Sequence, residues 1–523
     1  MERPASRTAP DLMDEMAARY PDRPYLADPG HRLTYGEFRA EVRRHAKGLH
    51  ELGLGPGERL AILMGNRVEW LVAYFAAMTL GAEVVALNTW ATAREIAYQL
   101  GHARVEFLVF EPRFRDRDLT ALLEEVAGEP GLDPVPHYMV VDHGPADAVR
   151  FEELPALGAA VGDDAIDTAQ RAVDPGDTAC ILYTSGSTAL PKGVPLHHSG
   201  LIDNMWGIGE RLRLTEADRL WLGVGLFWSY ACVNALFALT THGGSIVLQH
   251  HFEPGEALRL IEEERCTVFY GVPAMVRPMW EHPDRPMRDL SSLRAGTTIG
   301  TPAQVQMAVD LGVAEISNVY GLTEAYGNSC VIHANEPLER RLVSSGPPLE
   351  GCEIMIADPD TGEAQAAGEP GEIRVRGHTM KGYLGDKGRT KEVFDADGFL
   401  GTGDLGVLDE DGYLTYRGRL KEMIKTGGIN VAPAEVEAVL SDHLAIDQVY
   451  VTGVPDERLD EAVAAVVVLE ADAVVTEDDL MDYCRDLLAA YKIPRRYRFI
   501  ASEELPLTTT GKLQRDRLAA LFD

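Results

Sequence analysis

The stretch from Arg59 to Asn88, RLAILMGNRVEWLVAYFAAMTLGAEVVALN, constrains the fold of this chain most strongly. Between two short apolar runs, apolar residues recur at helical spacing: Trp70, Leu71, Tyr74, Phe75 and Met78. The hydrophobic period changes from that of a buried strand to that of a helix and back, so the stretch predicts a strand, a helix and a strand. We interpret its aromatic residues as core.

Similar apolar runs recur at residues 244–250, 266–273 and 316–321. This repetition predicts an α/β fold with parallel strands covered by helices. After about residue 345, short strands punctuated by glycine (CEIMIAD, GEIRVRG and DGYLTYRG) predict a small β-subdomain. Beyond residue 421 we expect helices at 433–440 and 477–490 and strands at 448–454 and 461–469.

The 523 residues are too many for one compact core. We therefore expect three parts. Residues 1–417 form a large N-terminal domain of α/β layered subdomains plus the small β-subdomain, residues 418–421 form a hinge, and residues 422–523 form a small α+β C-terminal domain.

The composition excludes several kinds of partner. A formal net charge of −33 disfavours nucleic acid and anionic membrane surfaces. No apolar run is long enough for a transmembrane segment. The six cysteines are scattered without C-x-x-C pairs, which argues against a disulfide framework or zinc site and favours the cytoplasm.

The stretch YTSGSTALPKGV, Tyr183–Val194, combines glycine and hydroxyl residues with Lys192. Backbone N–H groups in such turns form nests for anionic oxygens, and lysine adds a point charge suited to phosphate. A flexible surface turn is the alternative, but the short apolar run before it indicates a buried strand feeding the loop. The Walker A pattern is excluded, because Pro191 stands at its second glycine and Gly193 follows Lys192 where Ser or Thr belongs.

Four further motifs follow in order: YGLTEAYG at 320–327, GTGDL at 401–405, YRGRLKEMIKTGGINVAPAEVE at 416–437 and LTTTGKLQR at 507–515. With the first loop, they resemble the adenylate-forming (AMP-binding) superfamily. That superfamily includes acyl-CoA synthetases, luciferase-like enzymes and the adenylation domains of peptide synthetases. The resemblance runs from about residue 30 to the C-terminus.

The resemblance implies how ATP is bound. The expected triphosphate residues are Thr184, Ser185, Gly186, Ser187, Thr188 and Lys192. The expected frame of the adenine is Gly300, Thr301, Pro302, Asn318, Val319, Tyr320 and Gly321, with Tyr320 against its face. Asp404 would accept the ribose hydroxyls, with Arg419 beside it.

The resemblance also implies the catalytic groups. Thr323 would contact the α-phosphate, Glu324 would ligate Mg²⁺, and Lys512 would bridge the carboxylate and the α-phosphate. In the family the C-terminal domain is mobile. It turns about a hinge, here Lys421, and brings a glycine hairpin, here Gly427 and Gly428, to the CoA tunnel.

The acid pocket is expected near Trp228, Gly271, Thr298 and Ala325. Trp228 stands where many acyl-CoA synthetases have histidine; it either walls this pocket or is a buried core aromatic. The surrounding residues are small or apolar and include no lone arginine for a second carboxylate. A bulky hydrophobic monocarboxylic acid is therefore the expected substrate.

The expected function is an ATP-dependent carboxylic acid–CoA ligase that uses Mg²⁺. A stand-alone enzyme that loads a carrier protein is the alternative, although the acidic composition favours free CoA. The basic stretch 491–498 would meet CoA phosphates or be an ordinary exposed strand edge. An amino acid substrate is disfavoured because the usual aspartate after Phe227 is absent, and nothing points to a luciferase. A non-catalytic nucleotide sensor is disfavoured by the intact site residues.

Overall fold

The computed structural model describes residues 2–145, 148–184, 191–426, 429–456, 458–485, 487–488, 490–507 and 513–522. The chain divides into two compact units. The first comprises Met1–Gly300, Gln304–Glu353 and Val375–Leu400, and the second comprises Thr301–Ala303, Ile354–Arg374 and Gly401–Asp523. The domain boundary at 418–421 stays a prediction.

Eight strands of the first unit form one sheet: β1 (Pro24–Ala27), β2 (Arg32–Thr34), β12 (Arg219–Leu222), β13 (Ser245–Leu248), β14 (Val268–Tyr270), β15 (Ala295–Thr298), β16 (Glu315–Tyr320) and β17 (Cys330–Val331). Their order is β17-β16-β15-β14-β12-β13-β1-β2. Only the outer pairs, β1–β2 and β16–β17, are antiparallel.

Seven strands form a second sheet: β3 (Arg59–Leu63), β4 (Glu83–Ala86), β5 (Phe107–Phe110), β8 (His137–Val140), β9 (Val149–Arg150), β10 (Thr178–Thr184) and β11 (Lys192–His197). Their order is β11-β10-β4-β3-β5-β8-β9, and only β10–β11 is antiparallel. A small ribbon pairs β6 (Arg113–Phe114) with β7 (Arg117–Asp118).

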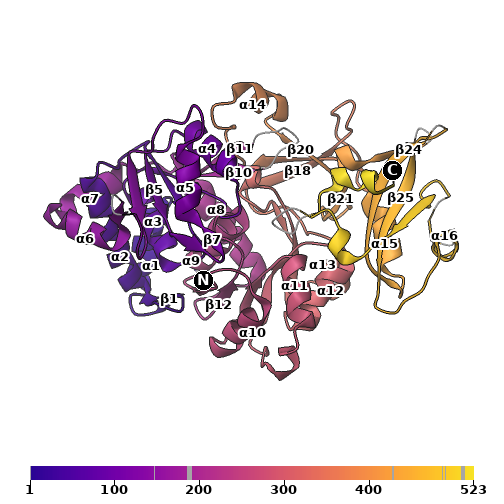
Figure 1. Ribbon diagram of the computed structural model, residues 1–523, viewed down its shortest axis with the longest axis horizontal. Coiled ribbons are helices and arrows are strands. Elements are labelled where there is room, and N and C mark those ends of the chain that lie inside the picture. Colours follow the sequence, from indigo (N-terminus) through magenta and orange to yellow (C-terminus); the bar gives the residue numbers. More distant parts are fainter. Residues whose placement is uncertain are drawn as a thin grey trace. The chain divides into compact units, whose positions relative to one another are not determined.

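Helices accompany these strands: α1 (Ala9–Arg19), α2 (Tyr35–Glu51), α3 (Val68–Thr79), α4 (Ala93–His102), α5 (Leu119–Ala127), α6 (Leu154–Leu157), α7 (Asp163–Ala172), α8 (His198–Leu212), α9 (Leu236–Thr241), α10 (Pro254–Glu263), α11 (Pro273–Glu281), α12 (Pro302–Leu311), α13 (Leu338–Val343) and α14 (Lys387–Val393). The predicted order of strand, helix and strand at 59–88 is confirmed as β3, α3 and β4. Helix α3 packs against both strands (Figure 1). The predicted α/β class is confirmed.

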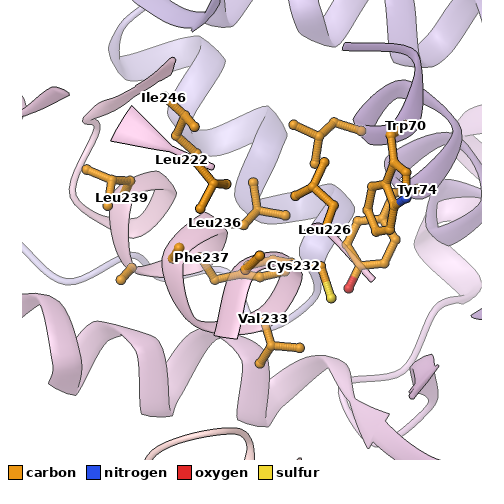
Figure 2. Close-up of a cluster of buried hydrophobic side chains, with 14 of the residues drawn as sticks. Trp70, Tyr74, Leu222, Leu226, Cys232, Val233, Leu236, Phe237, Leu239 and Ile246 are labelled. Atoms are coloured by element: carbon orange, nitrogen blue, oxygen red, sulfur yellow. The ribbon is translucent and has the colours of Figure 1, made fainter. Parts of the chain in front are cut away.

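The core of the first unit supports a segment of the predicted acid pocket. Trp70 and Tyr74 on α3 are fully buried, which confirms them as core. Figure 2 shows them facing Leu226 and Cys232, and Cys232 lies in the π-helical turn Ser229–Ala235. Burial of such large side chains contributes about 1.5–3 kcal/mol each. The turn that follows Trp228 is therefore built on a rigid base.

The second unit contains most residues of a four-stranded sheet, β18 (Cys352–Ala357), β19 (Gly371–Gly377), β20 (Leu400–Leu408) and β21 (Leu414–Arg419), paired in that order. A five-stranded sheet follows, with β22 (Ile424–Thr426), β23 (Ile429–Val431), β24 (Ile446–Asp456), β25 (Asp460–Leu469) and β26 (Arg496–Phe499). The predicted small β-subdomain and the α+β C-terminal segment are confirmed.

The helices of the C-terminal segment are α15 (Pro433–Ser441) and α16 (Glu477–Arg485). The prediction of a helix over 477–490 was wrong in its extent. The amide of Leu487 bonds to the Cys484 carbonyl at 3.1 Å, a tighter turn than the α-helical one, and the Leu487 side chain is exposed. An apolar residue that does not reach the core gives no reason to extend the helix.

Within the part of the chain that the structure describes, every helix is too short or too polar to span a membrane. All six cysteines are buried with free thiols.

Candidate active site

The hydroxyl- and glycine-rich loop is carried by the hairpin of β10 and β11. Thr184, the last residue of β10, pairs with Lys192, the first residue of β11. The buried strand that the sequence predicts before this loop is confirmed. Ser185, Gly186, Ser187 and Thr188 lie outside the described residues, so their contact with a triphosphate stays a prediction. The hairpin fixes both ends of the loop.

Thr323 and Glu324 lie in a tight turn directly after β16. A Cβ atom on Gly321 would lie 2.1 Å from the Gly327 carbonyl oxygen, so only glycine fits there. Tyr326 adopts a left-handed conformation with φ 56°, uncommon for a bulky residue. Its hydroxyl accepts a hydrogen bond from the His197 amide at 3.0 Å, which ties the turn to β11.

Three contacts orient this turn. The hydroxyl oxygens of Ser229 and Thr323 lie 3.2 Å apart. The Tyr383 hydroxyl donates to Glu324 Oε1 at 2.9 Å, and the Met380 amide donates to the Glu324 carbonyl at 2.7 Å. The Glu324 carboxylate is a hard oxygen ligand and is half-buried, so it fits Mg²⁺.

Tyr383 also contacts the phosphate-loop lysine. The Lys192 Nζ atom lies 5.0 Å from the centroid of the Tyr383 ring, within the range of a cation–π interaction. Burial, followed by the neighbouring Glu324 carboxylate, raises the pKa of the Tyr383 hydroxyl. The phenol is therefore protonated at neutral pH and acts as a donor. Sequence reasoning assigned no role to Ser229, although it directly follows Trp228, and it missed Tyr383, which lies outside the five motifs.

The residues expected around adenine come from neighbouring strands. Asn318, Val319 and Tyr320 close β16 and are buried, and Thr298 at the end of β15 pairs with Asn318. Gly300 has φ 138°, a conformation that favours glycine. Thr301 precedes Pro302, the first residue of α12. The adenine contact of these residues stays a prediction.

The expected acid-pocket residues lie among aromatic side chains. The half-buried Trp228 ring lies 5.5 Å from the Trp90 ring and 5.2 Å from the Phe227 ring. Gly271, Thr298 and Ala325 are buried. The Tyr230 hydroxyl donates to the Thr297 carbonyl at 2.8 Å, so its polar end is satisfied within the protein. Trp90 was not predicted, since it follows β4, far away in sequence.

Asp404 and Arg419 lie side by side in the second unit. They are register partners in β20 and β21, and the Arg419 Nε atom lies 2.9 Å from Asp404 Oδ1. The Asp404 side chain is 5% exposed, whereas that of Arg419 is 51% exposed. The guanidinium thus fixes a buried carboxylate, as a receptor for a diol requires. Contact with ribose stays a prediction.

Lys421 lies in the short turn Leu420–Glu422 that follows β21. Downstream, Arg515 donates to Glu437 on α15 at 2.7 and 2.9 Å and lies 3.4 Å from Glu422. Burial raises the pKa of the Glu422 carboxyl. The hinge role of Lys421 stays a prediction. Gly427, Gly428 and Lys512 lie outside the described residues, so their expected roles stay predictions.

Comparisons with known proteins agree with these motifs. The family model for AMP-binding enzymes matches residues 13–384, and that for the AMP-binding enzyme C-terminal domain matches residues 435–512. The chain therefore belongs to the AMP-binding enzyme family, the adenylate-forming superfamily that its motifs resemble. Within this family it groups with the AMP-forming acid–CoA ligases, which activate a carboxylic acid with ATP and transfer it to CoA.

Two relatives and one solved structure illustrate the match. The chain is 34% identical over 520 residues to the 3-(7a-methyl-1,5-dioxo-octahydro-1H-inden-4-yl)propanoyl:CoA ligase of Mycobacterium tuberculosis, covering 98% of this chain and 99% of the relative. It is 32% identical over 518 residues to 4-coumarate-CoA ligase 1 of Narcissus pseudonarcissus, covering 96% and 91%. The anthranilate CoA ligase AuaEII in complex with anthranoyl-AMP superposes with a TM-score of 0.85 at 27% identity, covering 99% and 97%.

Proposed function

We propose that this enzyme joins a bulky hydrophobic monocarboxylic acid, preferably one that carries a ring system, to free CoA through an acyl adenylate. The observation that carries the proposal is the contact between Ser229 and Thr323. It links the aromatic stretch Phe227–Tyr230 to the residue expected at the α-phosphate. An acid whose carboxylate reacts there would place its body against Trp228.

The residues account for the first half-reaction as follows. A carboxylate oxygen of the acid forms a bond to the α-phosphorus of ATP, and the bond from that phosphorus to the diphosphate breaks. Lys192 and Lys512 offset the negative charge that gathers on the phosphates, and Thr323 donates to the α-phosphate. Removing one such donor typically costs about 3–4 kcal/mol. Mg²⁺, held by Glu324, would supply further charge neutralisation when bound.

In the second half-reaction the CoA sulfur attacks the acyl carbon, the anhydride bond to AMP breaks and the thiol proton is released. Free CoA is favoured over a carrier protein because a net charge of −33 opposes docking of an acidic carrier over a broad surface, whereas a few local basic groups can hold CoA. In the basic stretch 491–498, Arg495, Arg496 and Arg498 are exposed near β26, which suits an anionic nucleotide. Asp404 and Arg419 would hold the ribose of ATP.

The substrates of relatives support a ring-bearing acid. The acids named for the two ligases and for the anthranilate enzyme all carry rings. In this chain the aromatic rings of Trp90, Phe227 and Trp228 offer apolar surface for a ring.

An acid-dependent ATP–diphosphate exchange assay tests the proposal. The panel contains a bicyclic propanoic acid, 4-coumarate, anthranilate, octanoate, acetate, succinate and phenylalanine. We expect exchange with the ring-bearing acids at least tenfold above that with acetate or succinate, and none with phenylalanine. Exchange with acetate or succinate alone would contradict the proposed substrate class.

Two controls accompany the assay. Lys512→Ala should abolish exchange, whereas Lys391→Ala, which removes an exposed lysine from α14, should leave it unchanged. Discharge of the adenylate is then compared between CoA and a phosphopantetheinylated carrier protein. Faster discharge to the carrier would favour the carrier-loading alternative.

A further inference from the structure

One buried tyrosine contacts both charged groups to which triphosphate binding is assigned. Through its hydroxyl, Tyr383 donates to Glu324 Oε1 at 2.9 Å, and over its ring lies the Lys192 ammonium, 5.0 Å from the centroid. Tyr383 is 8% exposed, and all three residues belong to the first unit.

Backbone bonds on both sides fix the position of Tyr383. The amide of Leu384 donates to the carbonyl of Gly193, the residue after Lys192, at 2.9 Å. The amide of Met380 donates to the carbonyl of Glu324 at 2.7 Å. The segment from Met380 to Leu384 is thus hydrogen-bonded both to β11 beside Lys192 and to the turn that carries Glu324.

Hydrogen bonds to helix α14 also fix the segment from Met380 to Leu384. The Tyr383 amide donates to Thr390 Oγ1 at 3.0 Å, and Thr390 Oγ1 donates to the Asp386 carbonyl at 2.6 Å. Asp386 caps the helix by accepting from the Arg389 amide at 2.9 Å. Because hydrogen bonds to β11, to the Glu324 turn and to α14 fix the backbone of this segment, the tyrosine ring has little freedom to move relative to Lys192 and Glu324.

The chemistry of a phenol suits a spacer between a cation and an anion. Its single proton engages one carboxylate oxygen, and the other oxygen keeps its acceptor capacity for a cation. The ring face attracts an ammonium group without neutralising its charge. A tyrosine therefore holds both groups in place while leaving each able to bind a ligand of opposite charge.

We propose that Tyr383 is a positioning residue that sets the Glu324 carboxylate and the Lys192 ammonium for the magnesium–ATP complex. This inference rests on the proposed function, because that function assigns both groups to the triphosphate. The hydroxyl serves the metal side through Glu324, and the ring serves the phosphate side through Lys192. The two effects are separable by substitution.

The test is calorimetric titration of the acid-free enzyme with ATP, once with Mg²⁺ and once with a chelator. Tyr383→Phe keeps the ring and removes the hydroxyl, so we expect about tenfold weaker binding of MgATP and unchanged binding of metal-free ATP. Tyr383→Leu also removes the ring and should weaken both. The KM for the acid should stay within about twofold in Tyr383→Phe.

Tyr25→Phe is the matched control, since Tyr25 is a buried tyrosine of the same unit whose hydroxyl contacts Thr240 at 2.9 Å. It should bind both forms of ATP like the wild type. Unchanged MgATP binding by Tyr383→Phe, or equal weakening of both forms, would overturn the inference. The proposed function is judged separately by acid-dependent exchange in the wild type, which no Tyr383 result alters.

Discussion

At the scale of single residues, the position of Trp228 leaves two roles open for its side chain. Trp228 is half-buried between the Trp90 and Phe227 rings, directly before the turn that carries Ser229. Both readings of Trp228, pocket wall and core aromatic, are compatible with this placement. A substitution separates them, because a wall acts on substrate choice whereas a core residue acts on stability.

Trp228→Ala should change the choice of acid more than the affinity for ATP. A methylene of fit in an apolar pocket is worth about 1–3 kcal/mol, so we expect the ratio of kcat/KM for a ring-bearing acid to that for octanoate to change about tenfold or more. The KM for ATP should stay constant. A fixed ratio together with a lower melting temperature would show that Trp228 is only core.

His198 makes stability depend on pH. It is 1% exposed, and its Nδ1 atom accepts from the Ala9 amide at 3.2 Å. Burial lowers the pKa of His198 to about 4, with Asp177 and Asp11 opposing the shift and His197 adding to it. In the unfolded chain histidine titrates near 6.5, so between these values the unfolded state binds more protons.

The stabilising contribution of neutral His198 is therefore complete above pH 6.5 and is lost as pH falls towards 4. It amounts to about 3 kcal/mol over that range. His198→Gln keeps an acceptor for Ala9 and should show a smaller fall of the urea midpoint between pH 6.5 and 4.5. Tryptophan fluorescence reports this unit alone, because all six tryptophans lie within residues 1–300. Parallel curves for the two proteins would refute the assignment.

At the scale of helices and strands, a buried carboxylate of the second unit links several elements. Glu437 on α15 accepts two bonds from Arg515 and one from the Val451 amide of β24 at 2.8 Å. Arg515 begins the short helical turn Arg515–Arg517, three residues after Lys512 in the sequence. One carboxylate thus joins α15, β24 and the segment that begins at Arg515.

Glu437→Gln should loosen this junction. An amide cannot accept from both guanidinium nitrogens as a carboxylate does, so we expect a loss of about 1–3 kcal/mol in local stability. Amide hydrogen exchange of β24 and β25, followed by mass spectrometry, measures it. Glu435→Gln on the same helix breaks the more exposed pair with Lys492 and should have a smaller effect. Equal protection in both variants would contradict the assigned role.

The elements also show what the sequence predicts well. The alternation of β3, α3 and β4 and the strand β10 follow from local apolar patterns, and both were predicted. The contacts within the candidate site, in contrast, do not follow from local apolar patterns. Tyr383 and Glu324 are 59 positions apart, and Ser229 and Thr323 are 94 apart. No local pattern encodes such pairs, since they form only when the sheets bring their loops together.

At the scale of the whole molecule, acidic residues far outnumber basic ones. The chain has 82 acidic and 49 basic residues, yet ATP and CoA are polyanions. Long-range attraction of these substrates is therefore unfavourable, and binding has to depend on local groups. Lys192, Arg419 and Lys512 are the local groups that the motifs supply, and the first two lie beside Tyr383 and Asp404 respectively.

The adenylate route is tested most directly by isotope transfer. A ring-bearing acid that supports exchange is labelled with ¹⁸O in both carboxylate oxygens and incubated with enzyme, ATP, Mg²⁺ and CoA. Because the attacking oxygen stays on phosphorus when the thiol displaces AMP, mass spectrometry should find one ¹⁸O atom in each AMP and one in the acyl-CoA. Label in diphosphate or inorganic phosphate, or unlabelled AMP formed together with acyl-CoA, would contradict an acyl-adenylate mechanism.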